Sequence, residues 1–308
     1  MPAPRVLRCY GDGHLALVGE GWPRVDIDPH LPRDGEERDQ AVAALPASFV
    51  LLTHDGRPAM DAVLDLLEAH PDAVLVASAA LCDRADRQLD LRDRLVDLGD
   101  WERVTFAGIT VTGLPAPRGG VPGMDLLPGV DRLPGGDRLP DPTSLLSEAT
   151  SSLGRALGGL PLLGSLGAQA AGLQGVMGGV MGGGHRRALH LAVEGGPSIL
   201  LAADSLCGAS PDRWLEELAE ELQVDVLVAS AGGDRVDGFV HAVRTLQPGR
   251  VVLYRDHDPY EWAGRSQPMA RFLEALEEDA PQVDLVHLRA GEELALRAPT
   301  DVPDGGAA

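Results

Sequence analysis

The chain has 308 residues, of which 44% are hydrophobic and 24% charged, a balance typical of a globular protein with a sizeable core. Its formal net charge is −21 and it contains no lysine, which argues against a nucleic-acid partner because such affinity comes mainly from cations that neutralise phosphates. The three widely spaced cysteines, Cys9, Cys82 and Cys207, give no disulfide framework. No apolar leader opens the chain, so we expect a cytoplasmic protein.

The first third of the sequence carries alternating strand and helix signals. Two short β-compatible runs, 5–10 and 14–19, surround the turn Gly11-Asp12-Gly13, and a third strand is expected within 24–30. Apolar periodicity then predicts the following elements in chain order: a helix at 36–45, a buried strand at 48–54, a helix at 59–71, a buried strand at 73–78, a charged helix at 81–100 and a strand pair at 103–117.

The last third repeats this pattern. It begins with a hairpin at 188–205 that turns at Gly195-Gly196. The elements expected after it are helices at 210–223, 236–249 and 266–281, buried strands at 224–232 and 250–258, and one late strand within 283–296. Each part thus begins with a hairpin and continues with strand–helix–strand units, which predicts an α/β protein whose sheets lie between helix layers.

A long segment separates these two parts. Residues 119–184 contain three Asp-x-Leu-Pro repeats, at Asp125, Asp131 and Asp137, followed by a glycine-rich run without a charged residue from Ala156 to Gly184. Frequent proline and glycine disfavour helices and sheet ladders. The segment is consistent with an insertion resting on the protein's own surface, a lid over a cleft, or a loop that contacts a protein partner or a membrane through 156–184. We therefore predict one domain, 1–296, interrupted by 119–184, and a disordered tail, 297–308.

Several residues with metal-binding side chains follow predicted strands. His54 and Asp55 end one strand, Asp204 ends another, and His257 follows a third, while His185 comes directly before a strand. Histidine and carboxylate side chains bind zinc, and a zinc-bound water is a nucleophile near neutral pH. Taken singly, each residue has an ordinary interpretation as a loop or capping residue, so their order along the chain carries the argument.

That order resembles the metallo-β-lactamase-fold hydrolases, in particular the branch with lactonase-like and N-acyl-phosphatidylethanolamine phospholipase-like members. The resemblance rests on "VDIDPH" with Asp28, "FVLLTHDGRPAMDAV", "SILLAADSLCG" with Asp204, and "RVVLYRDHDPY" with His257. It implies a four-layer αββα sandwich with a long Gly/Pro-rich insertion, and hydrolysis of a small ester, lactone or phosphoester.

The motif that holds metal in this family is degenerate here. The family's first histidine corresponds to His54, but its next three ligand positions fall on Gly56, Pro58 and Ala59, and a fourth falls on Arg118. Glycine, proline and alanine have no side-chain donor atom, so a dinuclear zinc site is not expected. At most one weakly bound zinc is predicted, with His54, Asp204 and His257 as ligands and His185 as a substitute for a lost histidine.

Two functions remain open at this point. In the first, the chain is a diverged hydrolase of a small molecule with a reduced or absent metal site, and His54, Asp55 and His257 do the catalytic work. In the second, the chain is a non-catalytic scaffold or binding module for a protein partner, and the glycine-rich insertion is its interaction element.

Overall fold

The computed structural model describes residues 5–32, 35–45, 48–54, 57–115, 187–203, 212–230, 236–254 and 269–296. The chain divides into two compact units, Met1–Arg118 with His185–Ala308, and Gly119–Gly184. All the described residues belong to the first unit. The predicted insertion, 119–184, and the predicted tail, 297–308, lie outside them, so the expectations for these two segments stay predictions.

The described residues form two seven-stranded sheets. The first sheet has the order β14-β1-β2-β3-β4-β5-β6, and the second has the order β13-β12-β11-β10-β9-β8-β7. The first comprises β1 (Arg5–Gly11), β2 (His14–Val18), β3 (Val25–Ile27), β4 (Phe49–Leu51), β5 (Val74–Ala77), β6 (Leu95–Asp97) and β14 (Glu293–Leu296). The second comprises β7 (Arg103–Phe106), β8 (Ile109–Gly113), β9 (Leu189–Val193), β10 (Ser198–Ala203), β11 (Val226–Ser230), β12 (Arg250–Tyr254) and β13 (Asp284–His287).

Both sheets mix pairing modes in the same way. Strands β3 to β6 run parallel to one another, and so do β10 to β13. The remaining neighbours are antiparallel. Because the parallel strands of one sheet point the same way, their carboxyl ends form one edge, where ligand sites of α/β proteins usually lie.

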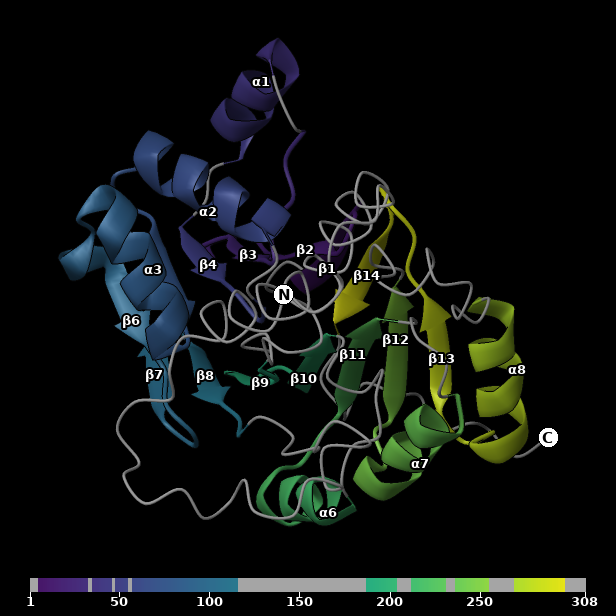
Figure 1. Ribbon diagram of the computed structural model, residues 1–308. Helices are drawn as coiled ribbons and strands as arrows, with labels where there is room; N and C mark the ends of the chain where they lie inside the picture. The colour runs from purple at the N-terminus through teal and green to yellow at the C-terminus, as the bar shows by residue number, and fades with distance from the viewer. Residues whose placement is uncertain are drawn as a thin grey trace, which may run out of the picture. The chain divides into compact units, whose positions relative to one another are not determined.

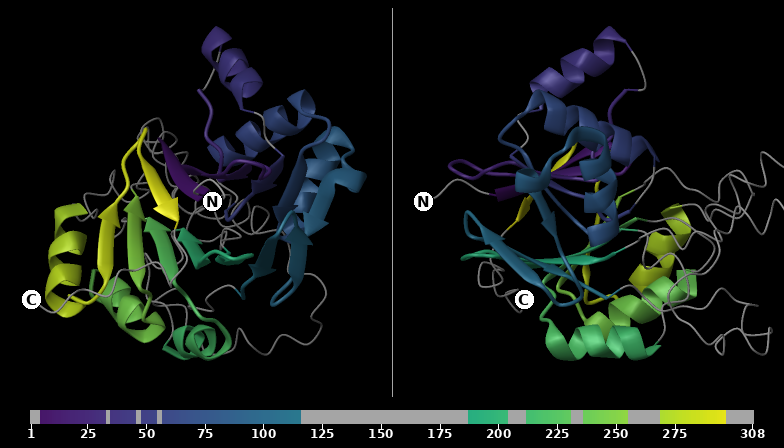
Figure 2. Two further views of the ribbon diagram at one scale, coloured as in Figure 1. Left: turned by 180° about the vertical axis from the view of Figure 1, so that it is seen from behind. Right: turned by 60° about the vertical axis from the view of Figure 1, so that its left-hand side comes forward.

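Helices cover the outer face of each sheet (Figures 1 and 2). On the first sheet these are α1 (Glu36–Ala44), α2 (Arg57–Ala69) and α3 (Ala79–Leu89), and on the second they are α6 (Asp212–Glu221), α7 (Val236–Leu246) and α8 (Met269–Asp279). The apolar stripe of α2 shows why they dock there: Val63, Leu66 and Leu67 are fully buried, and each such side chain contributes about 1.5–3 kcal/mol of burial free energy.

Three apolar clusters fill the three spaces between the four layers. One joins the inner faces of both sheets, with Leu7 and Leu51 from the first packed in the same cluster as Leu191 and Val228 from the second. The other two lie between each sheet and its helices. The arrangement is the predicted four-layer αββα sandwich.

Two sequence predictions were wrong in detail. The helix expected at 81–100 ends at Leu89, because Asp90 adopts a left-handed conformation (φ 51°) and the Asp86 carboxylate accepts a hydrogen bond from the Leu91 main chain. Strand β6 then follows and pairs with β5. The single strand expected within 283–296 is two strands, β13 and β14, which belong to different sheets. The short strand β6 was not predicted because the charged residues around it continue the helical sequence pattern of α3.

A buried ionic cluster lies in the first sheet. The His14 imidazole Nε2 donates to Asp26 Oδ1 at 2.8 Å, and the Arg24 guanidinium donates to both oxygens of the same carboxylate. Burial alone would raise the pKa of Asp26, but hydrogen bonds from His14 and Arg24 outweigh burial and lower it. Since ionised Asp26 accepts bonds from two donors, the cluster stays charged and rigid.

A buried histidine, His190 of β9, contacts Ser198 at the amino end of β10 in the second sheet. The Ser198 hydroxyl donates to the Gln223 carbonyl, so His190 Nε2, 2.8 Å from Ser198 Oγ, must be the donor in that contact. A histidine that donates to a serine cannot remove the proton of that serine. The pair is therefore structural, and burial lowers the pKa of His190.

The strands that flank the predicted insertion pair with each other, which generates a first prediction. Gly113 of β8 is in register with Leu189 of β9, and Leu114 N donates to Ala188 O at 3.1 Å. Deleting residues 121–183 should therefore leave a folded protein, since the flanking strands pair without them. Thermal unfolding followed by circular dichroism should remain cooperative. An insoluble product or a broad transition would mean that the segment is part of the core.

The His190 contact generates a pH prediction. Because burial lowers the pKa of His190 in the folded protein, the unfolded chain binds the proton first as the pH falls. This group should therefore decrease the stability as the pH drops below about 6.5, the usual value for histidine. Urea unfolding of wild type and His190→Gln across this range measures the effect. The variant keeps a donor for Ser198, and the difference between the two proteins should shift in favour of the variant at low pH. A pH-independent difference would contradict the prediction.

Candidate functional site

Three buried polar side chains lie at the carboxyl edges of the sheets. Seven polar or charged residues are buried among the described residues. Three of them, Asp28, Thr53 and Ser230, lie at or just beyond the carboxyl ends of β3, β4 and β11. Burying a polar group is costly unless it is hydrogen-bonded, so these positions indicate where the structure maintains polar chemistry.

Asp28 and Thr53 join the ends of two neighbouring parallel strands. Thr53 N donates to Asp28 Oδ1 at 2.7 Å, and the Thr53 hydroxyl donates to Asp28 Oδ2. Asp28 N in turn donates to Leu51 O at 2.9 Å. Asp28 has a positive φ of 45°, a conformation that aspartate tolerates better than most residues. Since Thr53 engages both of its carboxylate oxygens, Asp28 is a structural clamp rather than a free ligand.

Thr53 is also bonded through its third polar group. The Thr53 carbonyl accepts a hydrogen bond from Arg187 N at 2.8 Å. The amide, hydroxyl and carbonyl of Thr53 are thus all paired with other segments of the chain. His54, which is half-buried, follows directly. The residue that precedes the predicted site histidine is therefore held in place by hydrogen bonds to all three of its polar groups.

The other predicted site residues, Asp55, His185, Asp204 and His257, lie outside the described residues, so their grouping around His54 is untested. The strands that precede two of them are described. Asp204 comes directly after β10, and His257 comes three residues after Tyr254, the last residue of β12. Both strands flank β11 and run parallel to it. These two candidates therefore follow strands that end at one edge of the second sheet.

Sequence reasoning missed Arg187 altogether. It lies between the glycine-rich run and β9, and its guanidinium bonds Leu98 O and Asp100. The only signal in the sequence is a charged residue at the boundary between an uncharged run and a strand. Asp28 was identified through the resemblance alone, because a lone aspartate before proline is a common turn residue.

The expected absence of a dinuclear zinc site stays a prediction. No group of three or more His, Cys, Asp or Glu close enough to hold a metal ion occurs among them. His54 is the one predicted ligand within the described ranges, and Ala59, at a family ligand position, is a buried alanine of α2. A single site that uses His185, Asp204 or His257 remains a prediction, since those residues are not described.

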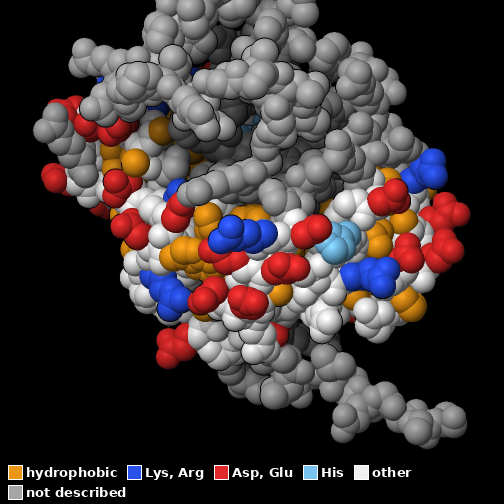
Figure 3. Space-filling view, turned by 60° about the horizontal axis from the view of Figure 1, so that its bottom comes forward, with side chains coloured by type: hydrophobic (Ala, Val, Ile, Leu, Met, Phe, Trp, Pro, Cys, Tyr) orange, Lys and Arg blue, Asp and Glu red, His pale blue; other side chains and the backbone are white. Residues whose placement is uncertain are grey.

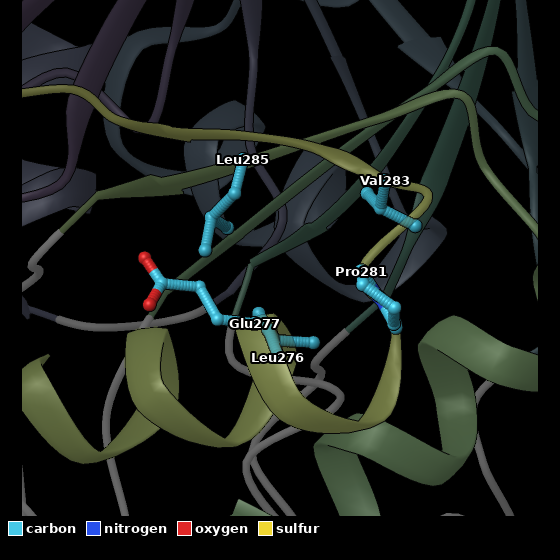
Figure 4. A pocket seen from close by; sticks show the side chains of 6 residues that line it. Leu276, Glu277, Pro281, Val283 and Leu285 are labelled. Atoms are coloured by element: carbon cyan, nitrogen blue, oxygen red, sulfur yellow. The ribbon is translucent and has the colours of Figure 1, made fainter.

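A pocket far from these strand ends lacks catalytic groups. It has a volume of about 120 Å³ and is lined by Leu276, Glu277, Ala280, Pro281, Val283 and Leu285 (Figure 4). It lies between the end of α8 and the amino end of β13, and five of its six lining residues are apolar. A single carboxylate in such a pocket gives neither a nucleophile–base pair nor a metal site.

The face shown in Figure 3 has acidic side chains interspersed with separate arginines, and no continuous basic patch is visible there. In the described parts of the chain, no helix combines the length and apolar character needed to cross a membrane.

Comparisons with known proteins bear on the fold. A scan against protein-family models finds no match to the sequence, and a search of curated proteins finds none either. Among solved structures, an isothiocyanate hydrolase from Delia radicum gut bacteria matches with a TM-score of 0.55 and 15% identity, over 95% of this chain and 99% of that one. The metallo-β-lactamase-fold protein YhfI from Bacillus subtilis matches with a TM-score of 0.54 and 10% identity, over 96% and 99%.

CmlA, a diiron β-hydroxylase from Streptomyces venezuelae, also matches, with a TM-score of 0.55 and 16% identity over 96% of this chain. This chain spans only 55% of the length of CmlA. Sequence identities this low support a common fold and nothing more specific. Membership of the lactonase-like branch stays a prediction. The two seven-stranded sheets, their outer helices and these likenesses together show that the chain has the metallo-β-lactamase fold.

Proposed function

We propose that the chain is a hydrolase of a small ester, lactone or phosphoester, with a reduced metal site that holds at most one zinc. The observation that carries this proposal is the hydrogen-bond network that fixes Thr53 directly before His54. A buried carboxylate must be compensated by hydrogen bonds, and Asp28 receives them from the amide and the hydroxyl of Thr53. A clamp of this kind holds the residue before His54 in one position, as a site that positions a reacting group requires.

The structural likenesses support the same class of reaction. The isothiocyanate hydrolase matches over nearly its whole length, and hydrolysis at the carboxyl edge of the sheets suits the placement of His54. The likeness to CmlA weighs less, because this chain spans only 55% of that protein.

In the proposed reaction, His54 and Asp204 hold a water at the edge of the sheets, and Asp55 lies next to His54 in the sequence. Neutral His54 accepts a proton from this water as the oxygen attacks the carbonyl or phosphoryl centre. His257 acts as the acid that protonates the leaving oxygen. A zinc ion, if bound by His54, Asp204 and His257 with His185 as a further candidate, would supply a water of lowered pKa, and His54 and His257 would then be ligands in place of base and acid.

Substituting His54 tests the proposal. His54→Gln should lower the rate of hydrolysis by about 100-fold or more, the usual contribution of a positioned acid or base, on a panel of small esters, lactones and phosphoesters. The matched control is His241→Gln on α7, where the histidine is exposed and pairs with the exposed Asp212 at 3.1 Å. The control should retain wild-type rates.

Elemental analysis of the purified protein complements the kinetics. We expect about one zinc per chain or less, since the family's ligand positions carry Gly56, Pro58 and Ala59. Nearly two zinc ions per chain would refute this interpretation. A wild-type protein without hydrolytic activity on the whole panel, or a His54→Gln variant as active as wild type, would refute the enzyme proposal and favour a scaffold.

The Asp28 clamp yields a stability prediction. Asp28→Ala leaves the buried amide and hydroxyl of Thr53 unpaired and places alanine at a positive φ, so it should cost about 2–4 kcal/mol of unfolding free energy. Asp28→Asn keeps an acceptor for Thr53 N, a donor for the hydroxyl and tolerance of that φ, so it should cost about 1 kcal/mol or less. Urea denaturation measures both. Equal losses in the two variants would show that the hydrogen bonds are not the cause.

A further inference from the structure

Arg187 lies where three segments of the chain meet. Its amide bonds the Thr53 carbonyl after β4, at 2.8 Å. Its guanidinium bonds Leu98 O and, at 2.6 Å, Asp100 Oδ1, both in the connection between β6 and β7. Arg187 itself leads into β9. The Arg187 side chain is 17% exposed and that of Asp100 is 48% exposed, so the guanidinium is largely shielded while its carboxylate partner faces solvent.

The segment that the guanidinium binds passes from one sheet to the other. Leu98 N donates to Ala77 O at the end of β5 in the first sheet, at 2.8 Å, and Trp101 N donates to Gly113 O at the end of β8 in the second, at 2.7 Å. The segment 98–101 is thus hydrogen-bonded to β5 at its start and to β8 at its end, and the Arg187 guanidinium binds this segment. Through its own amide Arg187 holds Thr53 at the same time.

The close packing around the guanidinium explains a glycine. A Cβ added at Gly113 would lie 2.5 Å from the Gly99 carbonyl oxygen and 3.0 Å from the Arg187 guanidinium. Contacts this short do not occur between a real Cβ and a carbonyl oxygen, so the main chains of β8 and of the crossing segment approach each other only because residue 113 lacks a side chain. The Arg187 guanidinium is thus closely packed against the main chain at Gly113.

We infer that Arg187 is a positioning residue for the candidate site: its guanidinium, fixed on Leu98 and Asp100, sets the place of its own amide and thereby the place of Thr53 and His54. Asp28 fixes Thr53 from the first sheet, and Arg187 fixes it from the junction of the two sheets. Two anchors that bond different groups of one residue determine its orientation as well as its position. The inference rests on the proposed function only in the role it gives to His54.

The test compares Arg187→Met with a matched control. Arg94→Met removes a guanidinium that bonds two main-chain carbonyls, Leu67 O and His70 O, next to the amino end of β6. Hydrogen exchange of the amides in 49–54, and the kcat and KM of hydrolysis, are measured for both. In Arg187→Met the Thr53 amide should exchange about ten-fold faster or more, and kcat should fall with little change in KM. Arg94→Met should leave both quantities at wild-type values.

Two further variants guard against a misfolded protein. Asp100→Asn removes the charge of one partner and keeps the arginine, and Arg187→Lys keeps the charge without the planar fork. Both should accelerate exchange of the Thr53 amide, but less than Arg187→Met does.

A folded Arg187→Met protein with wild-type exchange in 49–54 would overturn the inference. If Arg187→Met does not fold, wild-type exchange in Asp100→Asn would overturn it equally. Exchange is measured without substrate, so accelerated exchange in a chain that hydrolyses nothing on the panel would support the anchoring while refuting the proposed function.

Discussion

The bonds between the Asp28 carboxylate and Thr53 are the constraint around which the candidate site is organised. Parallel strands end with main-chain groups that the sheet itself leaves unpaired, and the amide of Thr53, beyond β4, takes its partner from a side chain. A carboxylate with two acceptor oxygens satisfies an amide and a hydroxyl together, which an apolar residue cannot do. The left-handed conformation of Asp28 turns the chain away from the strand while its side chain reaches back to the next one.

Most of the architecture was predictable from the sequence because it depends on periodicity. Buried runs such as Val226–Ser230 and the apolar stripe of α2 have no other stable arrangement in an α/β protein. Strand β6 was not predictable, since a three-residue strand among charged residues has no pattern of its own. The division of 283–296 into strands of two sheets also depends on long-range pairing, because β14 needs β1 as its partner.

The candidate site was predictable only in part. His54 could be selected because a histidine after a buried strand has a chemical role in a resembling family, and Asp28 because of the same resemblance. Thr53 and Arg187 could not be selected, since their roles arise from contacts between residues more than 20 positions apart in the chain. In contrast, the sequence alone shows that Gly56, Pro58 and Ala59 lack side-chain donor atoms, because this depends on residue type and not on geometry.

The pairing of β14 with β1 has a consequence for synthesis on the ribosome. Arg5 is in register with Leu296, so one edge of the first sheet combines an early and a very late part of the chain. While the nascent polypeptide emerges, β1 has only β2 beside it, and its other side presents unpaired main-chain groups that invite association with foreign strands. The first sheet acquires its final edge only after residue 296 has been translated, so β1 remains an open edge until then.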